Sequence, residues 1–291
     1  MTHDVRCVMA CKDILGEGCI WCPQDRVLWW IDIARPSLAR LDPVAGKVDT
    51  WALPKPVGSF ALRRDGGFLF AFRAGLATLD RPGGELQWIA TPDARLDVGR
   101  FNDGKCDRQG RFWVGTLDRN LKEPVGELYR IDPGFACTTM DRGFTISNGL
   151  GWSPDQRTLY FTDSPARTIY AYDFDAPAGQ IANRRIFVRF DERPGRPDGC
   201  TVDAEGYLWT ARIDGWCIER YAPDGRLARR VELPVQRPTC VSFGGEALDT
   251  LYITNSTFRL SEAELAKQPL AGGLLAVNAG VTGMVEPRFG A

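Results

Sequence analysis

Four polar side chains in this sequence each stand close to a glycine and are of types that bind hard metal ions. They are a glutamate, two asparagines and an aspartate, in the segments LGEG, FNDG, SNGL and PDGC: Glu17, Asn102, Asn148 and Asp198. Carboxylate and amide oxygens suit Ca²⁺, Mg²⁺ or Mn²⁺ better than Zn²⁺. Asn-Gly and Asp-Gly are also common turn dipeptides, so each position taken alone is equally consistent with a turn.

The composition excludes several other kinds of catalysis. The only histidine is His3, which excludes Ser-His-Asp and Cys-His nucleophilic catalysis and histidine-rich metal sites. The sequence contains no G-x-S-x-G nucleophile turn, no phosphate-binding G-x-x-x-x-G-K-[ST] loop and no dinucleotide-binding G-x-G-x-x-G. Any chemistry must therefore come from carboxylates, amides, arginine, lysine or a metal held by oxygen atoms.

The nine cysteines are an odd number without an export signal, so we expect reduced and mostly buried thiols. Cys19 and Cys22 form a single C-x-x-C pair, a spacing found in metal and redox sites. The segment 18–22 has the pattern of a strand, in which positions three apart point to opposite faces. No second pair completes a zinc site, so we interpret both cysteines as structural.

Charge and hydropathy limit the partners. The 36 Lys and Arg balance the 37 Asp and Glu, whereas nucleic acid and anionic membranes call for a basic surface. No apolar run approaches the roughly 18 residues of a membrane helix, and residues 1–18 lack the apolar core of a signal peptide. We therefore expect a cytoplasmic protein with no nucleic-acid or membrane partner, present as a monomer or weak oligomer.

An apolar–aromatic pair recurs six times, each time after a polar turn. The aromatic members lie 41, 43, 47, 49 and 43 residues apart. A third apolar segment follows in each copy (38–42, 77–80, 128–132, 169–173, 217–221 and 274–278), and most copies continue into a fourth, such as 47–53 and 227–233. The pairs are Leu28-Trp29, Leu69-Phe70, Phe112-Trp113, Leu159-Tyr160, Leu208-Trp209 and Leu251-Tyr252.

Six copies of about 45 residues with four short strands each are typical of a six-bladed β-propeller. We therefore predict an all-β fold of six four-stranded antiparallel blades around a central channel, as a single domain over residues 1–291. The segments 5–9 and 283–289 are candidates to share the last blade. Residues 261–268 are expected to form one or two helical turns, with a Ser261 N-cap and Glu264 in capping-box position.

The polar residues occupy one equivalent position of this repeat, at the start of the first strand. Because the first strand of each blade lines the channel of a propeller, their side chains converge on one axis. Four acid or amide groups meeting there favour a divalent-cation site over unrelated turns, since two carboxylates held close without a cation repel each other. Counting back eleven or twelve residues from each aromatic gives Glu17, Ser59, Asn102, Asn148 and Asp198, and the sixth copy places Thr239 and Cys240 there.

Five segments strongly resemble the SMP-30/gluconolactonase family of regucalcin-like six-bladed propellers, nearly end to end. They are LGEGCIW (15–21), RFNDGKCDRQGRFWVGT (100–116), ISNGLGWSPD (146–155), RPDGCTVDAEGYLW (196–209) and FGG with QPLAGG (243–245, 268–273). The resemblance implies a sugar lactonase that opens an aldono-lactone to the aldonic acid. It also implies one divalent metal ion, among Ca²⁺, Mg²⁺, Mn²⁺, Zn²⁺ and Fe²⁺.

The resemblance also assigns roles by motif. Glu17, Asn148 and Asp198 match the metal ligands of the family, with Asp198 also its proposed general base, and Arg100 and Asn102 match its substrate-contacting pair. Cys19 stands where many members have proline, and the segment LDRNLKEPVGE after Thr116 has no clear counterpart of an acidic substrate contact found there in some relatives. The candidates for that contact, of which we take the first, are Asp118, Asn120 and Glu123.

Some alternatives remain open. The sugar can be gluconolactone, galactonolactone, xylonolactone or arabinonolactone, and a broader esterase activity is compatible with the same site. A non-catalytic, regucalcin-like metal-binding or regulatory propeller needs the same ligands, although metal binding alone does not require Arg100. A protein-binding scaffold predicts no converging acids. Three tryptophans could stack on a sugar ring, although packing in the core is the favoured interpretation for each: Trp21, Trp152 and Trp216.

Overall fold

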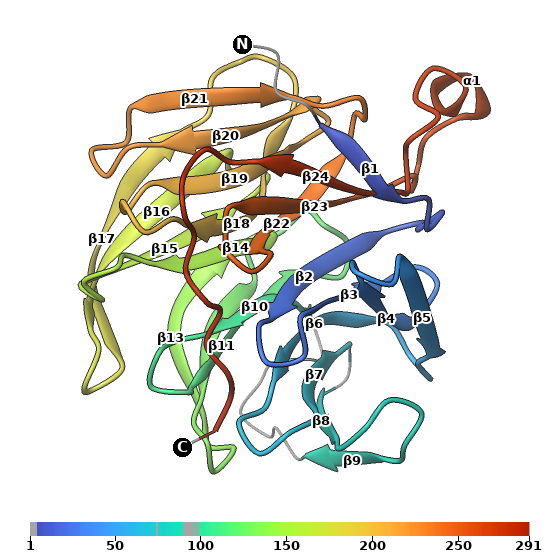
Figure 1. Cartoon of the computed structure of the whole chain (residues 1–291). Helices are drawn as coiled ribbons and strands as arrows, with labels where there is room; N and C mark the ends of the chain where they lie inside the picture. Colours follow the sequence, from blue (N-terminus) through green and yellow to red (C-terminus); the bar gives the residue numbers. More distant parts are fainter. Residues whose placement is uncertain (1–4, 74, 90–95, 97–98, 291) are drawn as a thin grey trace. The chain divides into compact units, whose positions relative to one another are not determined.

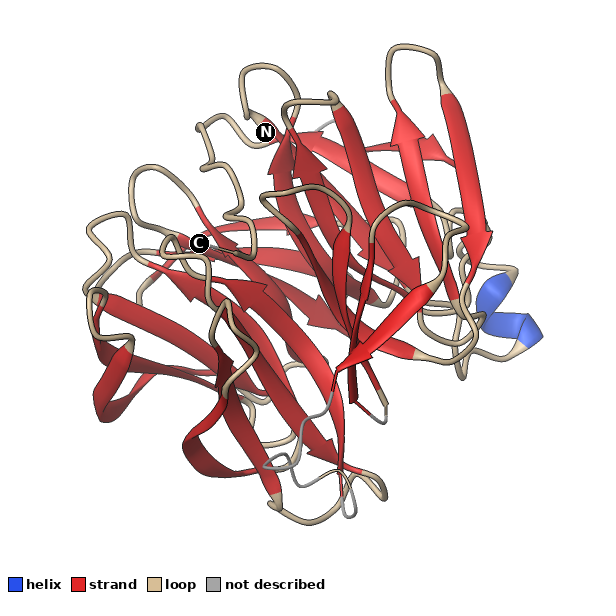
Figure 2. Ribbon diagram, turned by 90° about the horizontal axis from the view of Figure 1, so that it is seen from below, coloured by secondary structure: helices blue, strands red, loops and turns tan. Residues whose placement is uncertain are grey.

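The protein is built almost entirely of strands. The computed structural model describes residues 5–73, 75–89, 96 and 99–290, so His3 lies outside the described residues. The described strands form six four-stranded antiparallel sheets, accompanied by one short helix (Figure 1, Figure 2). The predicted fold class, a six-bladed β-propeller, is confirmed. Over the same residues, no helix is long and apolar enough to cross a membrane.

Contacts between residues divide the chain into two compact units of three blades each. The first unit comprises Met1–Leu53 and Phe190–Val285, and the second comprises Pro54–Arg189 and Glu286–Ala291. The expectation of a single domain over residues 1–291 stays a prediction. In the first unit, β22 lies against β18 and β2, and in the second unit β10 lies against β6 and β14.

The blades follow one plan, in which each sheet is ordered from its first to its fourth strand. In the first unit these are β2 (Gly16–Cys22), β3 (Val27–Asp32), β4 (Ser37–Asp42) and β5 (Lys47–Ala52); β18 (Arg196–Val202), β19 (Leu208–Ile213), β20 (Cys217–Tyr221) and β21 (Leu227–Glu232); and β22 (Pro238–Gly244), β23 (Thr250–Asn255), β24 (Leu274–Asn278) and β1 (Arg6–Met9). In the second unit they are β6 (Val57–Leu62), β7 (Phe68–Phe72), β8 (Gly75–Leu79) and β9 (Leu86–Ile89); β10 (Gly99–Cys106), β11 (Phe112–Asp118), β12 (Gly126–Ile131) and β13 (Cys137–Phe144); and β14 (Ser147–Trp152), β15 (Thr158–Asp163), β16 (Thr168–Asp175) and β17 (Gln180–Arg189).

The repeat predicted from the apolar–aromatic pairs is the second strand of each blade. The second strands β3, β7 and β11 are buried at every position, because both faces of an inner strand pack against other blades or strands. The predicted third and fourth segments are also strands, and the helical turns are confirmed as α1 (Glu262–Leu265). Its N-cap is Ser261, and the reciprocal bonds of a capping box with Glu264 are both present.

Two blades carry the same buried hydrogen bond between a turn aspartate and a second-strand tryptophan. The indole Nε1 of Trp113 donates to Asp107 Oδ2 at 2.9 Å, and that of Trp209 donates to Asp203 Oδ2 at 2.9 Å. The other carboxylate oxygen of each aspartate accepts two backbone N–H groups of its own turn. The turns DRQG and DAEG therefore satisfy their buried polar groups internally, which fixes the hairpin between the first and second strands.

One prediction about the chain ends is wrong. The N-terminal segment does join the last blade, since β1 pairs with β24, but residues 283–289 do not. Gly283 bonds to Leu248 at 2.7 Å in the first unit, whereas Phe289 bonds to Leu62 and to Arg64, both at 2.8 Å, in the second. The last blade already has four strands, so this segment covers other backbone groups instead. Gly110 admits it, because a Cβ there would collide with the carbonyl of Gly290.

Asp13, a buried carboxylate of the first unit, gives a prediction about stability and pH. Burial raises the pKa of Asp13 to about 6, although the indole Nε1 of Trp30 donates to it at 2.9 Å and lowers it. Its pKa in the unfolded chain is about 4, so protonation stabilises the folded state fully below that pH. This stabilisation is lost as the pH rises through about 6.

We expect Asp13→Asn to remove this contribution. As the pH rises from 4 to 7, the free energy of unfolding of the wild type should fall by about 2 kcal/mol relative to that of the variant. Urea unfolding at several pH values measures the difference. A difference that stays constant across that range would contradict the assignment.

Candidate active site

All six first strands are interrupted by a bulge at the position that the repeat singled out. In an antiparallel pair, a bulge places one extra residue on one strand and turns its side chains in a new direction, and it is frequent next to active sites. The register shifts lie between Glu17 and Ile20, Val57 and Ser59, Phe101 and Gly104, Asn148 and Leu150, Pro197 and Cys200, and Pro238 and Cys240. The sequence predicted the equivalence of these positions but not the bulges.

In the first unit, Thr239 links the strands that carry Glu17 and Asp198. Its hydroxyl donates to the carbonyl of Gly16 at 2.5 Å, directly beside Glu17. On its other side, a Cβ added to Gly199 would lie 2.8 Å from the carbonyl oxygen of Thr239. The glycine after Asp198 therefore lets two bulged backbones touch, and Glu17 and Asp198 flank the same threonine.

The two carboxylates of this unit differ in burial. Asp198 is buried, whereas Glu17 is partly exposed and its Oε2 accepts the backbone N–H of Gly18 at 3.1 Å. Gly18 adopts a φ of +59°, a left-handed conformation that favours glycine. The bulge therefore favours the glycine of this dipeptide, and the N–H of that glycine positions the glutamate side chain.

In the second unit, hydrogen bonds join three of the predicted residues in a row. The guanidinium Nη1 of Arg100 donates to Asn102 Oδ1 at 3.1 Å. The amide Nδ2 of Asn102 then donates to Asn148 Oδ1 at 3.0 Å and to the carbonyl of Ser147 at 2.8 Å. The hydroxyl of Ser59 donates to the carbonyl of Asn102 at 2.6 Å. The structure thus brings Arg100, Asn102 and Asn148 together.

The side-chain oxygen of Asn148 is oriented by its other contacts. Its Nδ2 donates to the hydroxyl of Ser164 at 2.8 Å, which leaves Oδ1 as the atom that faces Asn102. An amide oxygen has two lone pairs, so one remains for a further donor or a cation. The amide oxygen of Asn148 in the second unit and the carboxylates of Glu17 and Asp198 in the first are each oxygen donors of the kind that hard divalent cations prefer, so the chemistry of these residues fits such an ion.

Asp118 has a well-defined set of hydrogen bonds within its own loop. Its Oδ2 accepts the backbone N–H of Lys122 at 2.8 Å and that of Glu123 at 3.0 Å. These bonds hold the pKa of Asp118 below its usual value. Asp32 and Asp163 also end second strands, but they accept the backbone N–H groups of Ile14 and Ile146, which lie just before the first strands of their blades. The assignment of Asp118 as a substrate contact stays a prediction.

Asp103 is a carboxylate of the β10 bulge that the sequence did not single out, although it follows Asn102 directly. It accepts the backbone N–H of Gly104 at 2.8 Å and also that of Gly149, the residue after Asn148. Burial raises its pKa, and the nearby charge of Lys105 opposes this effect. It therefore ties the bulge of β10 to that of β14. The sequence feature that could have identified Asp103 is the FNDG segment, in which it stands between Asn102 and Gly104.

The predicted tryptophans and cysteines are mostly part of the core. Trp21 stacks on Tyr252 with ring centroids 6.0 Å apart, and Trp152 packs edge-on against Trp113. Trp216 differs, because 37% of its surface is exposed. Cys19 and Cys22 are buried and have separate partners: the Cys19 thiol donates to the carbonyl of Tyr252, and the Cys22 thiol to Asp25.

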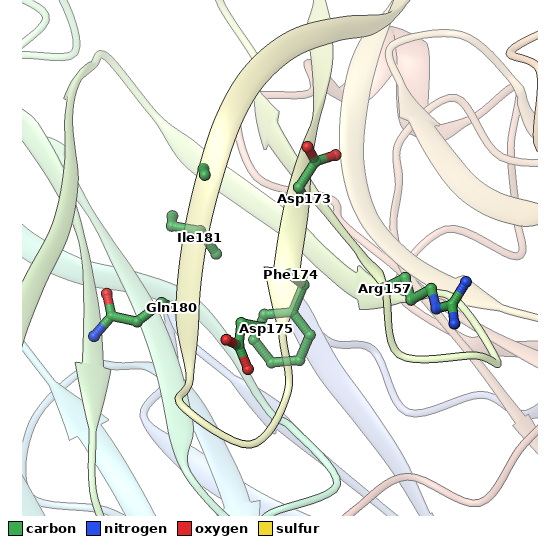
Figure 3. A pocket seen from close by; sticks show the side chains of 7 residues that line it. Arg157, Asp173, Phe174, Asp175, Gln180 and Ile181 are labelled. Atoms are coloured by element: carbon green, nitrogen blue, oxygen red, sulfur yellow. The ribbon is translucent and has the colours of Figure 1, made fainter.

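A pocket of about 570 Å³ lies on the outer half of the β14–β17 blade, away from the β14 bulge (Figure 3). Its walls come from the β16–β17 hairpin and from Arg157, and its polar lining includes Asp173 and Asp175. Over the described part of the chain, no three His, Cys, Asp or Glu residues gather as a metal cluster. The candidate ligand set is of mixed carboxylate and amide type and is not such a cluster.

Comparison with known proteins decides the family. A family model described as SMP-30/Gluconolactonase/LRE-like region matches residues 15–257. The chain belongs to this family. It is 40% identical to the 6-deoxy-6-sulfogluconolactonase of Pseudomonas putida over 290 residues, which cover 99% of both chains. It is 35% identical to the pentonolactonase of Haloferax volcanii, over 94% of both chains.

A solved structure of the family has the same fold. The regucalcin of Agrobacterium tumefaciens, described as a calcium-binding protein, superposes with a TM-score of 0.95 and 28% identity, covering 100% of this chain and 99% of that one. The family predicted from the five segments is confirmed. The relatives named as lactonases are carboxylic-ester hydrolases, and the prediction of an enzyme of this class is also confirmed.

Proposed function

We propose that the protein is a divalent-metal-dependent sugar lactonase that converts an aldono-lactone to the aldonic acid. Its end-to-end similarity to relatives named as lactonases carries this proposal. The matching positions Glu17, Asn148 and Asp198 are three of the bulged first-strand residues, which supports their role as metal ligands. Ca²⁺, Mg²⁺, Mn²⁺, Zn²⁺ and Fe²⁺ all remain candidates, as does the choice of sugar.

The residues of the chain have separate roles in the proposed reaction. A cation bound by these three ligands would polarise the lactone carbonyl as a Lewis acid. The carboxylate of Asp198 accepts the proton of the attacking water as general base. Arg100 donates to the sugar hydroxyls or to the developing oxyanion, where a preorganised donor is most effective. Asn102 contacts the sugar and, through its bond to Asn148, holds that side chain in place.

The row of hydrogen bonds that links Arg100 through Asn102 to Asn148 favours an enzyme over a protein that only binds metal. Metal binding requires the oxygen of Asn148 but not a guanidinium that bonds to Asn102. The regucalcin similarity keeps a calcium-binding or regulatory role as the second candidate. A location in the cytoplasm, in sugar catabolism, and a monomer or weak oligomer without nucleic-acid or membrane partners stay predictions from the sequence.

The test is a panel of aldono-1,4- and aldono-1,5-lactones assayed with metal-stripped and metal-restored protein. Stripping with a chelator should lower kcat/KM at least about 100-fold, because the Lewis acid and the water-activating charge are both removed. Restoring one divalent ion at a time should recover the activity and identify the ion. Unchanged rates after verified removal of the metal would exclude the metal mechanism. Binding of the ion without turnover of any lactone would favour the regulatory role.

A further inference from the structure

Two arginines of the first unit repeat the position that Arg100 has in the second. Arg100 stands two residues before Asn102, Arg196 two residues before Asp198, and Arg237 two residues before Thr239. Arg196 begins its first strand, Arg237 directly precedes one and Arg100 is the second residue of one, each just ahead of the bulge. Arg196 and Arg237 lie on neighbouring blades, because β18 packs against β22. The unit therefore brings two guanidinium groups to the end of the strands that carry Asp198 and Thr239.

Both arginines form ion pairs with a single carboxylate. The Nη2 of Arg196 lies 3.6 Å from Asp214 Oδ2, and the Nε of Arg237 lies 3.1 Å from Asp214 Oδ1. The charge of Arg237 also helps to lower the pKa of Glu264, and Arg259 brings a further positive charge over the ring of Phe258, whose carbonyl Arg237 contacts. One carboxylate cannot neutralise two guanidinium groups, so the Arg196–Asp214–Arg237 group keeps a net positive charge.

The two arginines differ in how tightly they are held. Arg237 is largely buried, and its Nη1 donates to the carbonyl of Phe258 at 2.6 Å. Arg196 has 41% of its side chain exposed, and its 3.6 Å pair with Asp214 is longer than a hydrogen bond. Within the described part of the chain, Asp214 is the charged group with which the guanidinium of Arg196 forms an ion pair. Its planar set of N–H donors is therefore available to an oxyanion.

An exposed aromatic surface adjoins these charges. Trp216 follows Asp214 by two residues, and its backbone N–H bonds to the carbonyl of Gln236 at 3.2 Å, next to Arg237. Its side chain is 37% exposed, and Phe258 is exposed as well. A sugar offers apolar ring faces and a charged sugar offers an oxyanion, so this combination suits a carbohydrate that carries an acidic group.

We propose that Arg196 and Arg237 bind an anionic substituent of the substrate, so that the enzyme prefers lactones of sugar derivatives that carry a sulfonate, phosphate or carboxylate group. This inference rests on the proposed lactonase function. Two residues of extended backbone advance about 6.6 Å, which is comparable to the size of one sugar ring. At this separation the arginines can reach a substituent of a sugar whose lactone carbonyl Asp198 serves.

The test compares substrates that differ in charge. Glucono-1,5-lactone is assayed beside its 6-phosphate, its 6-deoxy-6-sulfonate and glucaro-lactone, each corrected for spontaneous hydrolysis. We expect the wild type to show a kcat/KM at least about 10-fold higher for one of the charged lactones, mainly through KM. Arg196→Gln should lower the ratio of charged to neutral kcat/KM about 10- to 100-fold. Which charged lactone responds identifies the oxyanion.

A matched control separates recognition from structure. Arg226→Gln removes an exposed arginine of the same unit that pairs with Asp224 at 2.7 Å, and the ratio should not change. A wild type without preference for any charged lactone, or an Arg196→Gln variant with an unchanged ratio, would overturn the proposal. A purely structural role of the arginine would lower both activities in parallel and leave the ratio constant.

A binding measurement distinguishes failure of this proposal from failure of the lactonase assignment. If no lactone is hydrolysed, calorimetric titrations with 6-phosphogluconate and gluconate replace the kinetics. Binding of 6-phosphogluconate by the wild type that is lost in Arg196→Gln would support the anion site without the enzyme. Equal binding of both acids, or of neither, would overturn the anion site as well.

Discussion

Replacing Asp198 with asparagine is expected to lower kcat/KM for the best lactone substrate by at least about 1,000-fold. The change removes the proposed general base, which alone contributes about 10²- to 10⁴-fold, together with one anionic ligand of the metal. Asparagine has nearly the same shape as aspartate, so the buried bulge of β18 should be retained. Initial rates at saturating metal, with the bound metal measured directly, separate loss of the base from loss of the ion.

The control for Asp198→Asn is Asp224→Asn in the same blade. Asp224 is exposed and pairs with Arg226 at 2.7 Å, so its loss should leave the activity within about two-fold, as for other surface ion pairs. At saturating metal, kcat of Asp198→Asn should stay low, because added metal does not replace the base. A variant that keeps more than about a tenth of the wild-type activity would contradict the assignment.

Replacing Glu219 with glutamine should lower the free energy of unfolding by about 3–5 kcal/mol, the largest effect on stability that we predict. The carboxylate of Glu219 is fully buried and accepts from Arg212 Nη1 at 3.2 Å and from the hydroxyl of Tyr221 at 2.7 Å. Arg212 is also fully buried, and Arg230 lies 3.4 Å from the same carboxylate. Glutamine keeps the shape but removes the charge, which leaves the buried Arg212 with the half-exposed Asp191, 2.8 Å away, as its remaining counterion.

Urea unfolding measures this effect as a lower midpoint with an unchanged slope. The matched control is Glu232→Gln, which removes an exposed carboxylate that pairs with Arg230 at 2.7 Å. That change should cost less than about 1 kcal/mol, because water screens an exposed pair. Equal losses in the two variants would show that burial of the Glu219 carboxylate does not determine its contribution.

The sequence alone determined the blade plan of this protein. Strand propensity, tight turns and a repeat of 41 to 49 residues are local properties, so the second strands and the capping box at Ser261 followed from pattern. The same repeat placed Glu17, Asn102, Asn148 and Asp198 at equivalent positions. The family that the five segments resemble was also confirmed, because those motifs are contiguous in the chain.

Only the tertiary structure decided how these positions are connected. The bond from Asn102 to Asn148 and the two contacts of Thr239 join residues that lie on different blades, and no local pattern encodes such a meeting. For the same reason, no local pattern indicated that residues 283–289 lie outside the last blade. Each bulge depends on the register between two strands, and register is set by packing along the whole blade rather than by the bulged residue.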